Sequence, residues 1–270
     1  MASNLDPLIP EERDPNAERC RRLENERAFH NERFSDEVRE KQGKYYAAIK
    51  HGTSDFEARV QDCARNADVL EYGCGSAIQG LQIAGAAKSL TGIDISDVAV
   101  ADASRAATAL GLANTRYLRM DAEALEFEDA SFDVVFGRGI IHHLDLRRSF
   151  ASISRVLRPG GRAIFWEPLG HNPLLNRYRK LTPDARTTDE HPLIKPDFEL
   201  AQKHFEIEDT RFYGLTTILT VPIRDTKVGD GLLRVTAGVD RLLFQSPLRW
   251  LAWHCLVEFR KPATPDIPSA

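Results

Sequence analysis

The sequence predicts an α/β fold in which a mostly parallel, twisted sheet carries helices on both faces. Short apolar runs such as "DVLEYG", "TGIDIS" and "FDVVFG" alternate with helix-like stretches such as "DVAVADASRAATALG". Strands separated by helices require right-handed crossovers, which make neighbouring strands parallel. A glycine-rich turn follows the first apolar run, as in sheets that bind a nucleoside-containing ligand. A length of 270 residues suits one such domain with additions.

The N-terminal part of the chain differs in character from this alternating region. Residues 1–15 mix prolines with acids, and we expect them to form a flexible tail. Residues 16–66 are rich in Glu, Arg and Lys with spaced apolar residues, a pattern typical of exposed or capping helices. We therefore predict a helical extension, or lid, over 16–66, a main domain over 67–262 and a C-terminal tail over 263–270.

Seven strands are expected in the main domain. Their predicted ranges are 68–73, 89–96, 115–120, 132–137, 161–167, 205–214 and 253–262. The segment 168–195 is full of Pro, Asn and charge, so we expect an irregular insertion after the fifth strand, followed by a helix near 196–203. A second insertion, 215–248, contains an amphipathic helix around 231–243. Either insertion could contribute a substrate lid or a dimer surface. We expect the amphipathic helix to pack on the parent domain; a dimer surface is the second interpretation, and a lid or a membrane-surface contact are further alternatives.

Composition and charge disfavour several classes of function. A formal net charge of −4 and a pI near 6.1 give no general attraction to phosphate backbones, so no nucleic-acid partner is expected. The four cysteines form no C-x-x-C pair, which indicates neither a metal site nor a disulfide framework. No apolar run is long enough to span a bilayer, and no secretion signal is evident. We expect a cytoplasmic protein.

The glycine-rich turn "VLEYGCGSA" joins the first strand to the first helix of the main domain. Gly73 and Gly75 lack the side chains that would keep a ligand away from the backbone. By itself this turn also fits an NAD site, with Ala77 at the usual third glycine, or a tight turn without ligand. Asp94, at the end of the second strand, could accept hydrogen bonds from ribose hydroxyls, and Asp121 after the third strand could meet an adenine amine.

The set of motifs "VLEYGCG", "TGIDIS", "DAEAL", "SFDVV", "IIHHL" and "LRPGGR" resembles the class I S-adenosylmethionine-dependent methyltransferases, particularly their small-molecule, type 11-like group. The resemblance covers residues 68–167. It implies a Rossmann-like seven-stranded fold, S-adenosylmethionine as the cofactor and methyl transfer to a metabolite or natural product. Ala77 departs from the commoner glycine of this pattern.

Carried over position by position, the resemblance implies a set of cofactor-binding residues. The glycine turn would form the wall under the methionine portion of the cofactor. The acids that follow the second and third strands, each with the residue after it, would hold the ribose and the base. The end of the fourth strand would lie below the sulfonium. Tyr45 and Tyr46, in the lid, would face the sulfonium, or else pack at a helix end. The remaining members are Glu71, Gly73, Cys74, Gly75, Asp94, Ile95, Asp121, Ala122, Gly137 and Arg138.

Methyl transfer from a sulfonium requires in-line approach of a nucleophile, whose proton the enzyme must accept. His142 and His143 follow the fourth strand at the carboxyl edge of the sheet, where ligands of open α/β sheets gather. The alternative is that at least one of them packs or caps a helix. Further acid–base candidates are Glu167, His171 and His191.

The sequence leaves alternatives for the overall function. A protein with the same pocket could promote a rearrangement or cyclisation without methyl transfer, or sense the cofactor. A nicotinamide oxidoreductase is disfavoured by Asp121 and the "LRPGG" turn. Oxygen, nitrogen and carbon acceptors are all compatible with these residues, and both a monomer and a homodimer are open.

Overall fold

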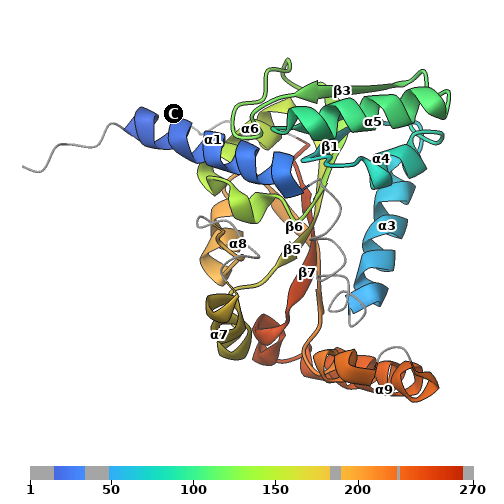
Figure 1. The fold of residues 1–270 in the computed structure, drawn as a ribbon, viewed down its shortest axis with the longest axis vertical. Helices are drawn as coiled ribbons and strands as arrows, with labels where there is room; N and C mark the ends of the chain where they lie inside the picture. Colours follow the sequence, from blue (N-terminus) through green and yellow to red (C-terminus); the bar gives the residue numbers. More distant parts are fainter. Residues whose placement is uncertain (1–14, 34–48, 183–189, 224–225, 264–270) are drawn as a thin grey trace, which may run out of the picture.

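The computed structural model describes residues 15–33, 49–182, 190–223 and 226–263 (Figure 1). Its centre is a seven-stranded sheet of order β3-β2-β1-β4-β5-β7-β6. The first five strands pair in parallel, and β7 is antiparallel to both β5 and β6. The strands are β1 (Asp68–Tyr72), β2 (Ser89–Asp94), β3 (Thr115–Arg119), β4 (Phe132–Arg138), β5 (Leu157–Pro168), β6 (Glu206–Tyr213) and β7 (His254–Arg260). The predicted fold class is confirmed.

Helices cover both faces of this sheet. One face packs against α6 (Leu146–Val156) and α8 (Lys195–Ala201). The other packs against α3 (Lys50–Ala64), α4 (Ile78–Ile83) and α5 (Asp97–Ala109). Each face therefore has its own hydrophobic core, as expected of a parallel sheet buried on both sides.

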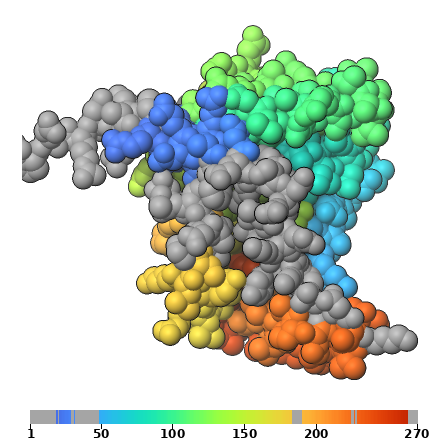
Figure 2. All heavy atoms as spheres, viewed as in Figure 1, coloured from blue at the N-terminus to red at the C-terminus, as the bar shows by residue number. Residues whose placement is uncertain are grey.

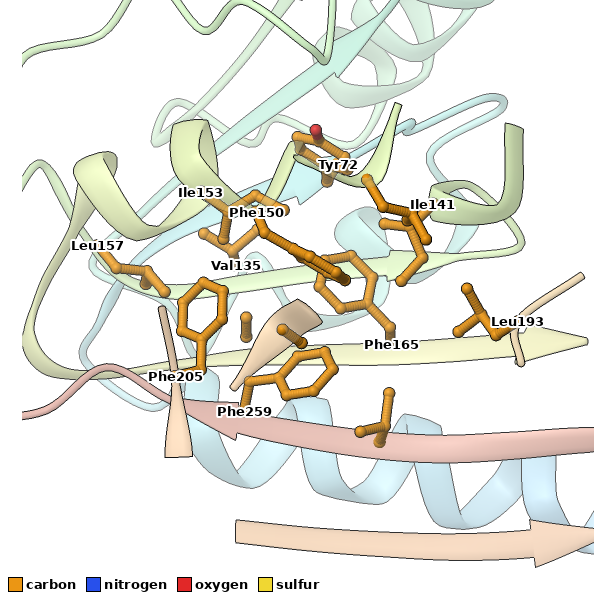
Figure 3. Packing of buried hydrophobic residues seen from close by; sticks show 14 of the residues in the cluster. Tyr72, Val135, Ile141, Phe150, Ile153, Leu157, Phe165, Leu193, Phe205 and Phe259 are labelled. Carbon is orange, nitrogen blue, oxygen red and sulfur yellow. The ribbon is translucent and has the colours of Figure 1, made fainter. Parts of the chain in front are cut away.

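The core on the α6 side is dominated by aromatic rings (Figure 3). Phe150 of α6 lies with its ring 5.8 Å from that of Phe259 on β7, and Phe165 of β5 lies 6.4 Å from Phe259. All three side chains are at most 1% exposed. Truncating one such ring to alanine typically costs about 3–5 kcal/mol, so this cluster fixes the β5–β7 half of the sheet.

The two described helices of the N-terminal extension differ in their packing. Phe56, Val60 and Ala64 follow one another at four-residue spacing on α3 and are buried in the second core. Helix α1 (Pro15–Arg33) instead lies on the surface, across the end of the molecule that carries α5 and α6 (Figure 2). The extension predicted over 16–66 thus contains one helix of the central layers and one surface helix.

A helix lies within the segment 168–195, which we expected to be irregular. Helix α7 (Pro173–Leu181) begins at Asn172, whose side chain accepts hydrogen bonds from the backbone of Leu174 and Leu175. Proline in the first helical turn needs no hydrogen-bond partner for its nitrogen and already has a helical φ. The Asn-Pro pair was therefore a helix start signal that the sequence analysis missed.

The fifth strand also begins earlier than predicted. β5 starts at Leu157, which pairs with Phe132 of β4, and the next paired residue is Arg162 opposite Val134. The intervening Pro-Gly-Gly sequence bulges out of the ladder instead of forming a turn before the strand. Gly160 has a φ of +79°, a conformation that glycine adopts without steric cost.

The second insertion contains η4 (Thr217–Ile223), α9 (Lys227–Leu243) and η5 (Pro247–Leu251). Helix α9 begins four residues before the predicted range, because the Thr226 hydroxyl caps it by accepting the backbone N–H of Gly229. Within the described ranges, no helix combines the length and apolar character required to cross a membrane.

Candidate active site

The glycine turn after β1 has the backbone shape that its sequence predicts. Gly73 and Gly75 have φ values of +71° and +49°. Ala77 also has a positive φ, +55°, and its side chain is fully buried immediately before α4. The departure from the commoner glycine is therefore accommodated without a change of backbone conformation, at a cost of roughly 1–2 kcal/mol. Cys74, between the glycines, is buried, and its backbone N–H donates to Ile93 of β2.

Asp94 links this turn to the end of β2. Its Oδ2 accepts the backbone N–H of Gly75 at 2.8 Å, and its Oδ1 accepts that of Ser96 at 2.9 Å. Each carboxylate oxygen retains a second lone pair. The side chain is half-buried, as is the neighbouring Ile95. The carboxylate is therefore held in one orientation at the carboxyl edge of the sheet, where it can accept further hydrogen bonds.

Glu71 lies under the turn and is directed at α4. Its Oε1 accepts the backbone N–H of Gly80, and a Cβ on Gly80 would lie 2.2 Å from its Oε2. Complete burial raises the pKa of this carboxyl to about 8. Oε2 has no hydrogen-bond partner among the described residues. Glu71 thus braces the start of α4 and presents one unsatisfied buried oxygen.

Two predicted site glycines make room for a neighbouring side chain. A Cβ on Gly137 would lie 2.6 Å from Ile140, and a Cβ on Gly73 would lie 2.8 Å from the same side chain. Both glycines are consequently needed for packing of the β4 end, whatever else they contact. Arg138, the last residue of β4, is half-buried.

Asp121 and Ala122 follow β3 and face helix α1. One oxygen of Asp121 accepts the backbone N–H of Glu123 at 2.9 Å, and the other forms an ion pair with Arg19. The carbonyl of Ala122 accepts the hydroxyl of Tyr72. Asp121 is therefore engaged by the extension helix in this structure.

The buried carboxylate of Glu123 anchors α1 over the carboxyl edge of the sheet. It forms ion pairs with Arg19 and Arg22 and accepts the backbone N–H of Asp145 at 2.8 Å. Arg22 also donates to the carbonyl of His143 at 3.2 Å. Helix α1 thus contacts residues that follow β3 and β4.

A buried carboxylate–histidine pair lies where β4 and β5 end. Glu167 is completely buried, and its Oε1 accepts the backbone N–H groups of Ile140 and Ile141 at 2.9 and 3.1 Å. Its Oε2 lies 2.6 Å from Nδ1 of His142. Burial raises the pKa of Glu167 to about 8, against the opposing effect of the backbone amides of Ile140, Ile141 and His142. The contact fixes the orientation of the imidazole ring.

His143 continues this cluster. Its ring centroid lies 4.1 Å from that of His142, and its Nδ1 lies 3.8 Å from Oε2 of the buried Glu26 on α1. One ligand atom from each of His142, His143 and Glu190 lies within 4.8 Å of the others. These three are the described residues that could hold a cation, a grouping that the sequence analysis did not predict.

His171 and His191 are not brought into the buried cluster. His171 is exposed and accepts the backbone N–H of Lys195 through Nε2. The His191 ring pairs with Asp197 at 3.0 Å on the surface, although its backbone N–H donates to His142 at 2.7 Å. Both imidazoles have structural contacts in the insertion. Tyr45 and Tyr46 lie outside the described residues.

Comparison with known proteins agrees with this arrangement. A family model described as a methyltransferase domain matches residues 70–165. Residues 70–165 are thus similar to a methyltransferase domain and lie within the fold of the class I methyltransferases. An O-methyltransferase of Penicillium expansum is 32% identical over 142 residues, which are 50% of this chain and 49% of that protein. The chain therefore spans about half the length of this curated relative.

Solved structures resemble the methyltransferase domain in fold. YcgJ of Bacillus subtilis aligns with a TM-score of 0.56 and 17% identity, over 77% of this chain and 99% of that one. The [4+2]-cyclase SpnF aligns with a TM-score of 0.55 and 21% identity, over 78% of this chain and 81% of that one. The methyltransferase fold thus occurs in proteins described by different chemistry.

Proposed function

We propose that the protein transfers the methyl group of S-adenosylmethionine to a hydroxyl group of a small-molecule acceptor. The observation that carries this proposal is the buried His142–Glu167 pair at the carboxyl ends of β4 and β5. It occupies the edge of the sheet where open α/β folds bind ligands, and the glycine turn opens on the same edge. A general base and a cofactor site are the two parts that such a reaction needs.

The cofactor side of the proposal rests on the groups around the glycine turn. Asp94, already oriented by Gly75 and Ser96, accepts the ribose hydroxyls. The unsatisfied Oε2 of Glu71 accepts the amino group of the methionine portion, a cation that would also stabilise the buried carboxylate. The cofactor supplies a methyl group on a sulfonium. The other proposed contacts are Gly73, Cys74, Ile95, Asp121, Ala122, Gly137, Arg138, Tyr45 and Tyr46.

The acceptor side depends on the orientation of His142. When Glu167 is ionised it accepts a hydrogen bond from Nδ1–H of His142, and for that state we assign Nε2 as the nitrogen that accepts the proton once the acceptor is bound. A neutral hydroxyl becomes a competent nucleophile only if its proton is removed as the carbon–oxygen bond forms. The name of the Penicillium expansum relative, an O-methyltransferase, supports an oxygen acceptor. Glu167 acts through His142 and is a positioning residue.

Site-directed variants test this assignment. His142→Ala should lower turnover by roughly 100-fold or more while leaving S-adenosylmethionine affinity within a factor of a few, because the base belongs to the acceptor half of the reaction. S-adenosylhomocysteine formation is measured against a panel of hydroxylated metabolites, and binding by calorimetry. His191→Ala, at an exposed ring, is the matched control. Wild-type turnover by a folded His142→Ala protein would remove the base assignment.

Glu167→Gln separates positioning from packing. The amide preserves the side chain's volume but replaces one carboxylate oxygen with an N–H donor, so the His142 ring loses its preferred partner. Turnover should fall by roughly tenfold or more with little change in cofactor affinity, and the pH profile of turnover should shift. A loss of stability with an unchanged pH profile would indicate a purely structural role.

Chelation distinguishes the base from a metal ligand. If Nε2 of His142 accepts a proton during turnover, it is not bound to a cation, and prolonged treatment with a chelator should leave turnover unchanged. Activity that disappears on chelation and returns with Zn²⁺ would instead assign His142, His143 and Glu190 as ligands.

A second candidate is conversion of a substrate without methyl transfer. The likeness to SpnF in fold keeps this class of reaction open for the same scaffold. Substrate consumption without formation of S-adenosylhomocysteine would favour it, whereas equal amounts of methylated product and S-adenosylhomocysteine would exclude it.

A further inference from the structure

Exposed apolar side chains are concentrated in two segments of the chain that lie at one end of the molecule. Of the thirteen large apolar residues exposed in the described ranges, ten lie between residues 174 and 248. They belong to α7, η4, α9 and η5. Helices α7 and α9 lie at the end opposite α5 in Figure 1, and the space-filling view shows the orange α9 forming the edge of that end (Figure 2).

Helix α9 has a continuous apolar stripe. Successive members are separated by four, three, four and three residues, the spacing that places side chains on one side of an α-helix. Their exposed fractions range from 38% to 72%. The stripe consists of Val228, Leu232, Val235, Val239 and Leu242.

This stripe is not the face by which α9 packs on its own domain. The buried positions of the helix are Gly229, Leu233, Thr236 and Asp240. Asp240 accepts hydrogen bonds from Thr216 and Thr217. On a helical projection these residues lie roughly 100° away from the centre of the stripe. Packing on the parent domain therefore explains one face of the amphipathic helix and leaves the apolar stripe unexplained.

The charges around the stripe are predominantly positive. Among the described side chains of α7, α9 and η5, five exposed basic ones accompany one exposed acid, Asp230, which lies 3.6 Å from Lys50 of α3. The chain as a whole carries a net charge of −4, so this end has the opposite sign from the molecule. The exposed basic residues are Arg177, Lys180, Arg234, Arg241 and Arg249.

We propose that the end of the molecule formed by α7, α9 and η5 docks on an anionic lipid surface, with the α9 stripe entering the interfacial layer. An apolar stripe with arginines beside it is the pattern of a helix that lies in the plane of a membrane interface. Basic residues near such a surface strengthen binding by attraction to anionic headgroups. A second copy of this chain would bring two positive faces together, which like-charge repulsion disfavours.

Vesicle flotation tests the proposal on the full-length protein. Vesicles of phosphatidylcholine alone are compared with vesicles of equal parts phosphatidylcholine and phosphatidylglycerol. Wild-type protein should float with the anionic vesicles and remain at the bottom with the neutral ones, and added salt should weaken the association. Flotation excludes aggregates, which do not rise with the lipid.

Variants of α9 identify the surface. Val235→Asp combined with Leu242→Asp should lower the vesicle-bound fraction at least tenfold, because the charged side chains cannot enter the interfacial layer. Arg234→Gln combined with Arg249→Gln should lower partitioning by roughly 20- to 30-fold, about fivefold for each basic residue removed. Leu110→Asp is the matched control, since Leu110 is 63% exposed at the end of α5. Unchanged melting temperatures and S-adenosylhomocysteine affinities establish that the variants are folded.

Three results would overturn the proposal. The first is wild-type protein that does not float with anionic vesicles, or floats equally well with neutral ones. The second is an α9 double variant that floats like the wild type. The third is a dimer by light scattering that the α9 double variant converts to a monomer without any vesicle binding, which would assign the stripe to a second copy of the chain.

Discussion

At the scale of single residues, the polar groups of the site differ in how far sequence alone could predict them. Asp94 and Glu71 occupy set positions relative to the glycine turn, so a local pattern was enough to single them out. Glu26 and Arg22 belong to a helix more than 100 residues away from the His143 region that they contact. Such contacts depend on how α1 lies across the sheet, which no local pattern specifies.

Asp94→Ala should weaken S-adenosylmethionine binding by roughly 1.5–3 kcal/mol, the range for hydrogen bonds to a charged group. The change also removes the acceptor for the backbone N–H of Gly75, so the glycine turn loses a support. Calorimetric titration measures the effect. Asp102→Ala, at an exposed carboxylate on α5, is the control. Wild-type affinity in the Asp94 variant would exclude it from the cofactor site.

Glu71→Gln should alter how stability depends on pH. Burial raises the pKa of Glu71 to about 8, above its ordinary value of 4.5, so the folded protein binds this proton more tightly than the unfolded chain. Stability is therefore greatest at low pH for this group and falls as pH rises from about 4.5 to about 8, by up to about 1.4 kcal/mol per unit of pKa difference. The variant should show a shallower decline over that window, with part remaining because the pKa of Glu167 is raised in the same direction.

Denaturant unfolding midpoints measured across this pH window test the Glu71 prediction. The exposed Glu128→Gln variant is the control and should decline with pH as the wild type does. An identical pH slope in the Glu71→Gln and wild-type proteins would contradict the raised pKa.

At the scale of elements, one buried carboxylate joins α9 to the loop after β6 and to the start of η4. Asp240 accepts backbone N–H groups of Leu215 and Thr216 at 3.0 and 2.6 Å, and the hydroxyls of Thr216 and Thr217 at 2.6 and 3.2 Å. Asp240 is 4% exposed, so water cannot readily replace its carboxylate as the acceptor of these hydrogen bonds. The position of the apolar stripe of α9 therefore depends on this contact.

Asp240→Ala should lower the free energy of unfolding by about 3 kcal/mol or more, because several buried donors lose their acceptor at once. For a protein of this size the melting temperature should fall by roughly 6–12 °C. Calorimetry measures the loss, and hydrogen exchange shows whether it is confined to η4 and α9. Asp230→Ala, exposed on the same helix, should change stability little. Equal stability of the two variants would show that Asp240 does not join these elements.

The existence of most elements could be predicted, whereas several boundaries could not. The alternation of strand-like and helix-like stretches predicted all seven strands. The pattern is clearest in the central strands, which are buried on both faces and consist largely of apolar residues. The bulge at Gly160 requires knowledge of how β4 and β5 pair, which depends on residues far apart in the chain. Helix α7 was missed for a different reason: its charge content suggested a loop, although Asn172 and Pro173 form a good helix start.

At the scale of the whole molecule, the order of the strands follows from the connections between them. Crossovers through helices make β1 to β5 parallel, and the right-handed rule limits where each strand can join the sheet. β7 enters antiparallel between β5 and β6, so its first residue lies beside the end of β5, where Pro168 pairs with His254. That placement brings His254 to the edge of the sheet where β5 ends. Burial, together with the charges of His142 and two arginines, lowers the pKa of His254. A single sequence did not single out this histidine.

Ligand-induced stabilisation tests the cofactor assignment on the whole molecule. The proposed contacts come from the glycine turn, the ends of β2, β3 and β4, and Tyr45 and Tyr46 of the extension, so binding should stabilise the fold as one unit. S-adenosylhomocysteine at about 100 times its Kd should add about 2.7 kcal/mol to the free energy of unfolding. For a chain of this size that corresponds to a rise of roughly 5–10 °C in melting temperature.

NAD at the same concentration should leave the melting temperature unchanged, because the proposed site offers no contacts for a second nucleotide beside the His142–Glu167 pair. Differential scanning calorimetry with each ligand measures both effects. The Asp94→Ala variant should need a higher concentration of S-adenosylhomocysteine to reach the same rise, because its weaker affinity shifts the dependence on ligand. A larger rise with NAD than with S-adenosylhomocysteine would identify the glycine turn as a dinucleotide site and overturn the methyltransferase mechanism, although the fold would stand.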